Sequence, residues 1–414
     1  MFDRLFRAVM LASIAALPAV ALVAPMAIAV LFTLNAIAAI GVLASRGRKA
    51  VLPPAWLIAV LLSVPALGMV SALWSVIPGE SVLRALKIGL LLTAGMAIAA
   101  AAANATRPPA RQVAAVLLAG LAVAALLTLT DHVGLFELRE ELEPGFTPRR
   151  GIYNRGATVL LLVAWLAVLA LLRLERPALA ASVYVAAGLL IALKLGSGAS
   201  MVVWVLGAAV GAAWLLTRSR RPAAFGLVVA AACIAAPLLA AALPTPSAEN
   251  LDQRLLPSSW SHRIVIWKFA AKRIAERPLL GWGLDASRRI PGGRELLPWR
   301  MDADLENPQG FMSSVQRMPL HPHSLALQVW LELGAAGAIA LAVLLHLLVT
   351  RGVASGGTPE AQAALVALVF AAMSISNISY GAWQSWWLST LWLIAAVAVL
   401  LTPRESAAAG AGTR

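Results

Sequence analysis

The feature that most constrains this chain is a series of apolar runs, each long enough to cross a lipid bilayer. A membrane-spanning helix needs about 20 mostly apolar residues. Twelve such runs cover residues 8–23, 26–44, 55–73, 82–103, 112–130, 157–172, 178–195, 201–216, 223–243, 323–349, 361–378 and 385–401. Hydrophobic residues make up 61% of the chain and charged residues 13%, which excludes an ordinary soluble domain. We therefore expect an all-α integral membrane protein with about 12 transmembrane helices in a lipid bilayer.

The apolar runs divide the chain into four parts. Residues 1–243 hold predicted transmembrane helices 1–9, residues 244–322 form one large external loop with an active-site helix, residues 323–403 hold helices 10–12, and residues 404–414 form a cytoplasmic tail. A loop of about 80 residues is far longer than a connection requires, and long loops in compact proteins are usually functional or disordered. We expect this loop to contribute to an active site.

The placement of the basic residues predicts the orientation. There are 33 Lys and Arg residues against 19 Asp and Glu residues, a net charge of +14, which in a soluble protein would suggest nucleic-acid binding. Here the basic residues cluster in alternate short loops, whereas the connectors 74–80, 196–200 and 379–384 contain none. Short loops rich in Lys and Arg stay in the cytoplasm. We expect both termini in the cytoplasm, the large loop outside, and no nucleic-acid partner.

Within the large loop, the stretch SWSHRIVIWKFAAKRIAERP has the periodicity of a helix that Pro278 ends. Arg263, Trp267, Ala270 and Ile274 fall on one face of that helix. An arginine on an apolar face either pairs with a carboxylate of the fold or binds an anionic ligand. The following LLGWGLDASRR predicts a tight turn that presents Arg288 near the same place, although solvated charges are the simpler interpretation.

The string HPHSLALQVWLELG opens the tenth span. Proline favours the first helical position, which makes His321 the expected cap and places His323 in the first turn. The helix dipole there disfavours an imidazolium, so His323 should stay neutral near pH 7 and able to accept a proton. The alternative is that His321 and His323 bind a metal, but they lack the spacing of two ligands on one helix face and have no third ligand nearby. The two carboxylates of Asp302-Ala-Asp304 are interpreted as solvated loop residues. We therefore expect neither a metal nor a cofactor.

Four cations lie at the outer ends of the spans. Arg84 and Lys87 begin the fourth span, and we favour their snorkelling to lipid phosphates. Arg155 begins the sixth span, and Lys194 lies at the end of the seventh, next to a Gly-Ser-Gly turn. For these two residues, binding of a ligand phosphate and a structural role are about equally supported.

Three motifs give the chain a resemblance to a known family. These are HPHSLALQVWLELGAAG, the Arg263 to Trp267 pair followed by ERPLLGWGLD, and RGIYNRGA at the start of the sixth span. Together they are similar to the O-antigen ligase family, which includes O-antigen polymerases and some protein O-oligosaccharyltransferases. The resemblance covers about residues 70 to 400, and its specific part is residues 258 to 337.

This resemblance implies an inverting, metal-independent transfer of a glycan from undecaprenyl diphosphate to an acceptor hydroxyl. The reaction would take place on the periplasmic side of the bacterial inner membrane, with lipid A core as the acceptor of a ligase. Arg263 and Arg288 would hold the diphosphate, His323 would activate the acceptor, and His321 and Trp267 would support them. Glu332 matches the motif and is assigned a structural pairing role.

The sequence departs from the family between spans seven and eight, where many members carry a Ser-Arg pair and this chain reads Gly-Ser-Gly-Ala-Ser. Lys194 or Arg155 would then supply the missing charge at the diphosphate.

Three other functions compete with ligation to lipid A core. A polymerase of O-antigen or exopolysaccharide would use the same donor and a glycan acceptor. A transporter of polyprenyl-linked glycans predicts ionisable residues near the bilayer midplane, whereas the spans here are nearly free of charge at their centres. A passive scaffold in polysaccharide assembly would leave transfer intact when His323 is replaced.

Overall fold

Every predicted apolar run forms a helix in the computed structural model, which describes residues 1–130, 153–217, 221–244, 257–301 and 310–402. The first helices are α1 (Phe2–Val23), α2 (Ile28–Arg46), α3 (Ala55–Ser71), α4 (Pro78–Asn104) and α5 (Ala110–Thr130). They are followed by α7 (Asn154–Arg173), α8 (Pro177–Leu190), α9 (Gly198–Leu216), α10 (Pro222–Ala242), α12 (Leu325–Ala354), α13 (Pro359–Ile378) and α14 (Ser385–Leu401). Within the described residues, ten helices are long and apolar enough to span a bilayer, and α3 and α14 are shorter apolar helices. The prediction of an all-α integral membrane protein is confirmed.

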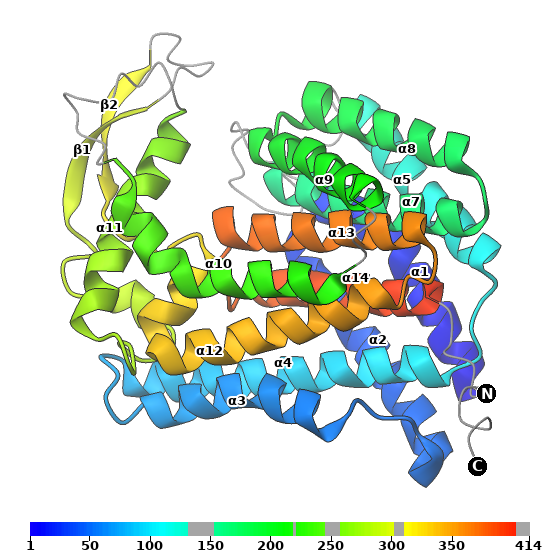
Figure 1. Cartoon of the computed structure of the whole chain (residues 1–414), viewed down its shortest axis with the longest axis horizontal. Coiled ribbons are helices and arrows are strands. Elements are labelled where there is room, and N and C mark those ends of the chain that lie inside the picture. Colours follow the sequence, from blue (N-terminus) through cyan, green and yellow to red (C-terminus); the bar gives the residue numbers. More distant parts are fainter. Residues whose placement is uncertain (131–152, 218–220, 245–256, 302–309, 403–414) are drawn as a thin grey trace.

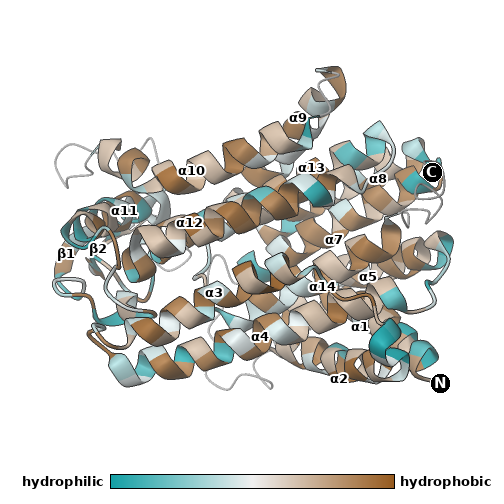
Figure 2. Ribbon diagram, turned by 60° about the horizontal axis from the view of Figure 1, so that its bottom comes forward, coloured by the Kyte–Doolittle hydropathy of each residue, from teal (hydrophilic) through white to brown (hydrophobic). Residues whose placement is uncertain are grey.

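The core of the bundle is built around α7. Nearly every residue of this helix from Gly156 to Leu171 is buried, because it packs against α1, α5, α8, α13 and α14. The outer helices instead expose large apolar side chains on the surface that a bilayer would cover, including Leu90, Leu216 and Leu238. Figure 2 shows hydrophobic residues along the helices and hydrophilic residues gathered at the two ends of the bundle.

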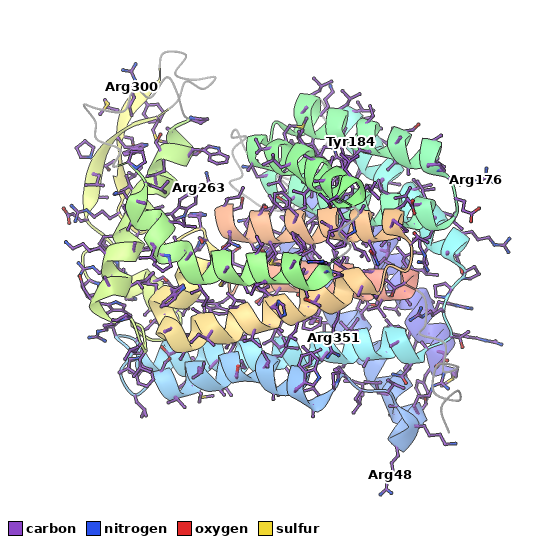
Figure 3. The ribbon with its side chains drawn as sticks, viewed as in Figure 1. Arg48, Arg176, Tyr184, Arg263, Arg300 and Arg351 are labelled. Carbon is purple, nitrogen blue, oxygen red and sulfur yellow. The ribbon has the colours of Figure 1, made fainter. Side chains whose placement is uncertain are left out.

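One end of the bundle carries the large loop, and we call it the α11 end. The loop contributes the helix α11 (Ser258–Glu276), the short helix η4 (Ala286–Arg289) and an antiparallel hairpin of β1 (Leu296–Met301) and β2 (Phe311–Gln316). Figure 1 shows α11 and the hairpin together at this end, while α1 begins and α14 ends at the opposite end. Arg48 and Arg176, from loops predicted to face the cytoplasm, also lie away from the α11 end (Figure 3).

Two glycines, one in the loop and one in α12, allow the backbone of the loop to pack closely against the backbone of α12. The N–H groups of Trp282 and Gly283 donate to the carbonyls of Leu331 and Glu332 at 2.9 Å each, so the loop docks on α12. Gly334 interrupts α12 with φ +62°, and a side chain there would collide with the backbone of Leu279. Gly281 has φ +67° and is equally close to Glu332. The loop is thus fixed to the span that follows it.

Candidate active site

The HPHS segment (residues 321–324) precedes α12 and carries both predicted histidines. The Ser324 hydroxyl accepts a hydrogen bond from the Leu327 amide at 3.3 Å, and the helix begins at Leu325. The expectation that Pro322 opens this helix with His321 as its cap is therefore wrong, because a serine hydroxyl caps the free amide groups well. His323 lies outside the helix with φ +54°, a conformation that is uncommon for a residue other than glycine.

The position of His323 defines which ring nitrogen can accept a proton. Its Nδ1 lies 2.6 Å from the carbonyl oxygen of Ser379. A carbonyl oxygen can only accept, so Nδ1 carries the proton and Nε2 keeps its lone pair. Burial lowers the pKa of His323 to about 4; the bond to Ser379 opposes this, and the positive charge of Arg263 adds to it. His323 is neutral near pH 7, and the cause is burial rather than a helix dipole.

His321 supports the backbone of His323. Its Nδ1 accepts a hydrogen bond from the His323 amide at 3.2 Å, and the centroids of the two rings are 4.3 Å apart. On the other side, Nε2 of His321 lies 3.2 Å from the side-chain nitrogen of Gln384. Burial lowers the pKa of His321 to about 3, with smaller effects from His323 and Arg288. Two neutral imidazoles therefore stand side by side at the α11 end.

The helix α11 brings Arg263 and Trp267 to this segment. The indole N–H of Trp267 donates to the Pro322 carbonyl at 2.9 Å, which ties the HPHS segment to α11. One turn earlier, Nη1 of Arg263 donates to the Ser259 carbonyl at 3.0 Å, whereas its buried Nε has no hydrogen-bond partner among the described residues. Figure 3 shows Arg263 on α11 near the helix bundle. This arginine is not paired with a carboxylate of the described fold.

A cavity of about 360 Å³ lies beside His321. Its lining includes two tryptophans and four cations, namely Trp383 and Trp386 with Arg84, Lys87, Arg155 and Arg288. Asp285 is the acidic residue of this lining, and it binds Arg84 at 2.8 Å and Arg288 at 3.2 Å. Guanidinium groups bind phosphate in a planar, bidentate geometry, and tryptophan faces stack on apolar faces of ligands. The cavity is therefore suited to an anionic carbohydrate or phosphate.

Glu332 forms hydrogen bonds with several residues that line the cavity. Its side chain is fully buried and accepts hydrogen bonds from the Asp285 amide and the Trp383 indole on one oxygen, at 2.6 Å each. The other oxygen accepts from the Ser287 hydroxyl at 2.6 Å and the Gln328 side chain at 3.0 Å. This single carboxylate joins the turn before η4, α12 and the connection between α13 and α14.

The predicted site residues are brought together except for one. Arg155, Arg288 and His321 line the cavity. Arg263 and Trp267 adjoin the HPHS segment through the electrostatic and hydrogen-bond contacts given above. Lys194 is exposed on the π-helical turn η3 (Ile191–Leu195) and does not line the cavity.

Four further residues belong to the site and were not predicted for it. Arg84 and Lys87 line the cavity instead of serving only as lipid anchors, and their charge at membrane depth was the available signal. Asp285 and Tyr380 carried no sequence signal. The hydroxyl of the half-buried Tyr380 bonds to Thr158 at 3.0 Å, and its electrostatic neighbours are Arg155 and Arg263.

The structure offers no ready metal-binding group in the part of the chain that it describes, where no three His, Cys, Asp or Glu side chains gather. Asp302 and Asp304 lie outside the described residues.

The fold and site together define a multi-pass α-helical membrane protein with a cation-lined cavity beside a neutral histidine pair. Residues 183–342 match the family described as O-antigen ligase, a stretch that holds Arg263, His323 and Glu332. A protein of Rickettsia conorii named "Putative polysaccharide ligase" is 28% identical over 253 residues, which cover 60% of this chain and 58% of that protein. A protein of the same name from Rickettsia felis is 25% identical over 339 residues, 81% of this chain and 78% of its own length. These matches confirm the resemblance to the O-antigen ligase family.

Proposed function

We propose that this chain is a glycan transferase that moves a glycan from undecaprenyl diphosphate to an acceptor hydroxyl, most directly in O-antigen ligation to lipid A core. The observation that carries the proposal is a neutral, half-buried His323 whose Nε2 is free to accept a proton, next to Arg263 and the cation-lined cavity. The family match and the relatives' names support a ligase-type enzyme.

The reaction that fits these residues is a single displacement. The acceptor oxygen forms a bond to the anomeric carbon while the bond from that carbon to the diphosphate oxygen breaks. The hydroxyl proton passes to Nε2 of His323, and the electron pair of the broken bond leaves with the diphosphate. Because one displacement occurs, the anomeric configuration inverts. General-base catalysis of this kind contributes about 10²- to 10⁴-fold.

The cations serve the leaving group, whose negative charge increases as the bond breaks. Arg263, Arg288 and Arg155 supply guanidinium groups, with Arg84 and Lys87 as additional positive charge. An anionic diphosphate beside His323 also favours the protonated imidazole, so donor binding raises the pKa of His323 above its low value in the free protein. The base becomes stronger when the substrate is present, and no metal ion is needed in this mechanism.

The proposed location is the bacterial inner membrane with the α11 end in the periplasm. Support comes from the basic residues of the short loops, two of which, Arg48 and Arg176, Figure 3 shows away from that end. An even number of spans puts both termini on the same side of the membrane, and the basic short loops support the cytoplasmic side.

The test is a lipopolysaccharide gel of a strain that lacks this gene, complemented with the wild type, His323→Ala or the control His346→Ala. His346 lies within α12, more than twenty residues beyond His323 in the sequence. We expect the O-antigen ladder with the wild type and the control, and loss of the ladder with accumulated lipid-linked polymer for His323→Ala. A core with one repeat unit would indicate a polymerase, and an unchanged ladder in the deletion strain would refute the ligase.

A further inference from the structure

The connection between α13 and α14 contacts both histidines of the candidate site. The carbonyl oxygen of Ser379 lies 2.6 Å from Nδ1 of His323. Gly381 leaves room for the other ring, because a Cβ atom at this position would lie 2.8 Å from Cδ2 of His321. The direction of the Ser379 carbonyl therefore determines how the His323 ring is turned and which of its nitrogens carries the proton.

Tyr380 follows Ser379 directly, and its side chain is held by two helices. Its hydroxyl lies 3.0 Å from the hydroxyl of Thr158 on α7 and 3.1 Å from the carbonyl oxygen of Asn154. Its ring packs edge-on against Trp386 on α14, with the ring centroids 4.7 Å apart. The Ser379 carbonyl belongs to the planar peptide group that ends at the Cα atom of Tyr380. A tyrosine fixed between α7 and α14 therefore restricts the rotation of that carbonyl.

A chain of buried hydroxyl groups extends from Tyr380 to the Gly-Ser-Gly turn that follows η3. The Ser197 hydroxyl of this turn donates to the Ser200 hydroxyl at 2.9 Å, and the Ser200 hydroxyl lies 3.4 Å from that of Thr158. The Thr158 hydroxyl donates to the Asn154 carbonyl at 2.8 Å. Its oxygen can therefore accept hydrogen bonds from both Tyr380 and Ser200. The turn, whose neighbouring cation lies outside the cavity, thus contributes hydroxyl groups to the support of Tyr380.

The Tyr380 hydroxyl serves the internal structure of the site and does not face a ligand. Burial raises the pKa of Tyr380 to about 12, although the bond to Thr158 and the charges of Arg155 and Arg263 oppose this shift. The phenol therefore keeps its proton near pH 7 and donates it within the hydroxyl chain. Tyr380 does not line the cavity beside His321. Its influence on the histidines passes through the backbone of the connection.

We propose that Tyr380 is a positioning residue for the transfer reaction. By tying the Ser379 carbonyl to α7, it holds the His323 ring so that Nδ1 keeps its proton and Nε2 presents its lone pair to the acceptor hydroxyl. The proposal rests on the proposed function, in which Nε2 of His323 is the base, and it names the residue that orients this base. It also gives a role to the Gly-Ser-Gly turn, which supplies the far end of the hydroxyl chain.

The test is a double-mutant cycle of Tyr380→Phe and His323→Ala, measured as kcat and donor KM of the purified proteins with an undecaprenyl-diphosphate-linked glycan. Phenylalanine keeps the ring packing and removes only the hydroxyl. We expect Tyr380→Phe to lower kcat about three- to tenfold, which corresponds to the loss of one hydrogen bond, and to leave the donor KM unchanged. Because Tyr380 acts through His323, the same substitution should cause no further loss in the His323→Ala protein.

The matched control is Tyr184→Phe on α8. It removes a tyrosine hydroxyl that lies 3.5 Å from the Trp204 carbonyl oxygen, and this variant should transfer the glycan at the wild-type rate. Thr158→Val removes the partner of the Tyr380 hydroxyl and should lower kcat in the same way, so it replaces Tyr380→Phe in the cycle if that variant does not fold. A wild-type kcat for Tyr380→Phe, or an equal loss in the His323→Ala background, would overturn the proposal.

A second measurement does not depend on activity. Nitrogen NMR of protein labelled with ¹⁵N-histidine reports the tautomer of each ring, and the signals of His323 are those that His323→Gln removes. We expect the proton on Nδ1 of His323 in the wild type and a mixture of the two tautomers in Tyr380→Phe. An unchanged tautomer in Tyr380→Phe refutes the proposal. If the wild type transfers no glycan, the proposed function fails, while the nitrogen signals still decide whether Tyr380 orients the ring.

Discussion

The buried carboxylate of Glu332 gives the sharpest quantitative prediction, because Glu332→Gln changes one atom and leaves the volume of the side chain nearly the same. All four groups that bind this carboxylate are donors, and they come from Asp285, Ser287, Gln328 and Trp383. A glutamine must turn its NH₂ group toward one pair of them. The Ser287 hydroxyl can rotate to accept instead, whereas the amide of Asp285 and the indole of Trp383 cannot.

The best orientation of the glutamine therefore points its NH₂ group at Ser287 and Gln328, and it loses the bond from Gln328. A hydrogen bond to a charged group contributes about 1.5–3 kcal/mol, and a buried donor left without a partner carries a penalty of about 1–3 kcal/mol. We expect Glu332→Gln to lower the free energy of unfolding by about 2–5 kcal/mol. Transfer should fall as well, because Asp285 positions Arg84 and Arg288.

The assay is denaturant unfolding of the purified protein in detergent, together with glycan transfer in the same detergent. Glu360→Gln is the matched control, since Glu360 is exposed in the first turn of α13 and should change stability by less than about 0.5 kcal/mol. If Glu332→Gln unfolds at the wild-type denaturant concentration, the carboxylate does not hold the site together and the reasoning is refuted.

Three further predictions follow from the site. Arg263→Lys should reduce transfer by about tenfold or more, because an ammonium cannot form a bidentate fork with phosphate; a wild-type rate would remove Arg263 from the donor site. Arg155→Ala should raise KM for the donor in a steady-state assay and Lys194→Ala should not, since the cavity includes Arg155 and excludes Lys194; equal effects would contradict this arrangement. The pKa values of about 3 and 4 for His321 and His323 lie below the ordinary value of 6.5, so these groups take up protons on unfolding. Stability should therefore fall as pH drops below about 6.5, by at most about 3 kcal/mol per pH unit near pH 5, and denaturant unfolding of a His321→Gln, His323→Gln double variant should show a weaker dependence.

The sequence predicts the helices well because each span is determined by its own apolar length. Twelve runs became twelve helices, and Pro278 ends the α11 stretch close to its last helical residue, Glu276. The start of α12 was misplaced because two local signals compete there. Pro322 favours a helix start, but Ser324, two residues further along the chain, caps the helix because its hydroxyl accepts a hydrogen bond from the Leu327 amide.

The sequence predicted only those site residues whose type alone indicates a chemical role. His323, Arg263 and Arg288 stand out as polar groups in an apolar chain. By contrast, Asp285 and Tyr380 act through contacts over long sequence separations, such as the bond from Arg84 to Asp285. Lys194 and Arg84 are both cations at a span end, and Arg84 lines the cavity because α4 packs against α14 and Arg84 pairs with Asp285. Contacts of this kind depend on tertiary packing and leave no local pattern in the sequence.

In the proposed mechanism, His323 removes the proton from the acceptor hydroxyl. The most direct measurement is the single-turnover transfer rate of purified wild-type, His323→Ala and His346→Ala proteins with an undecaprenyl-diphosphate-linked glycan, with and without added imidazole. We predict a loss of about 10²-fold or more for His323→Ala, partial recovery in imidazole, and a wild-type rate for His346→Ala. A His323→Ala protein that transfers the glycan at the wild-type rate would contradict the claim.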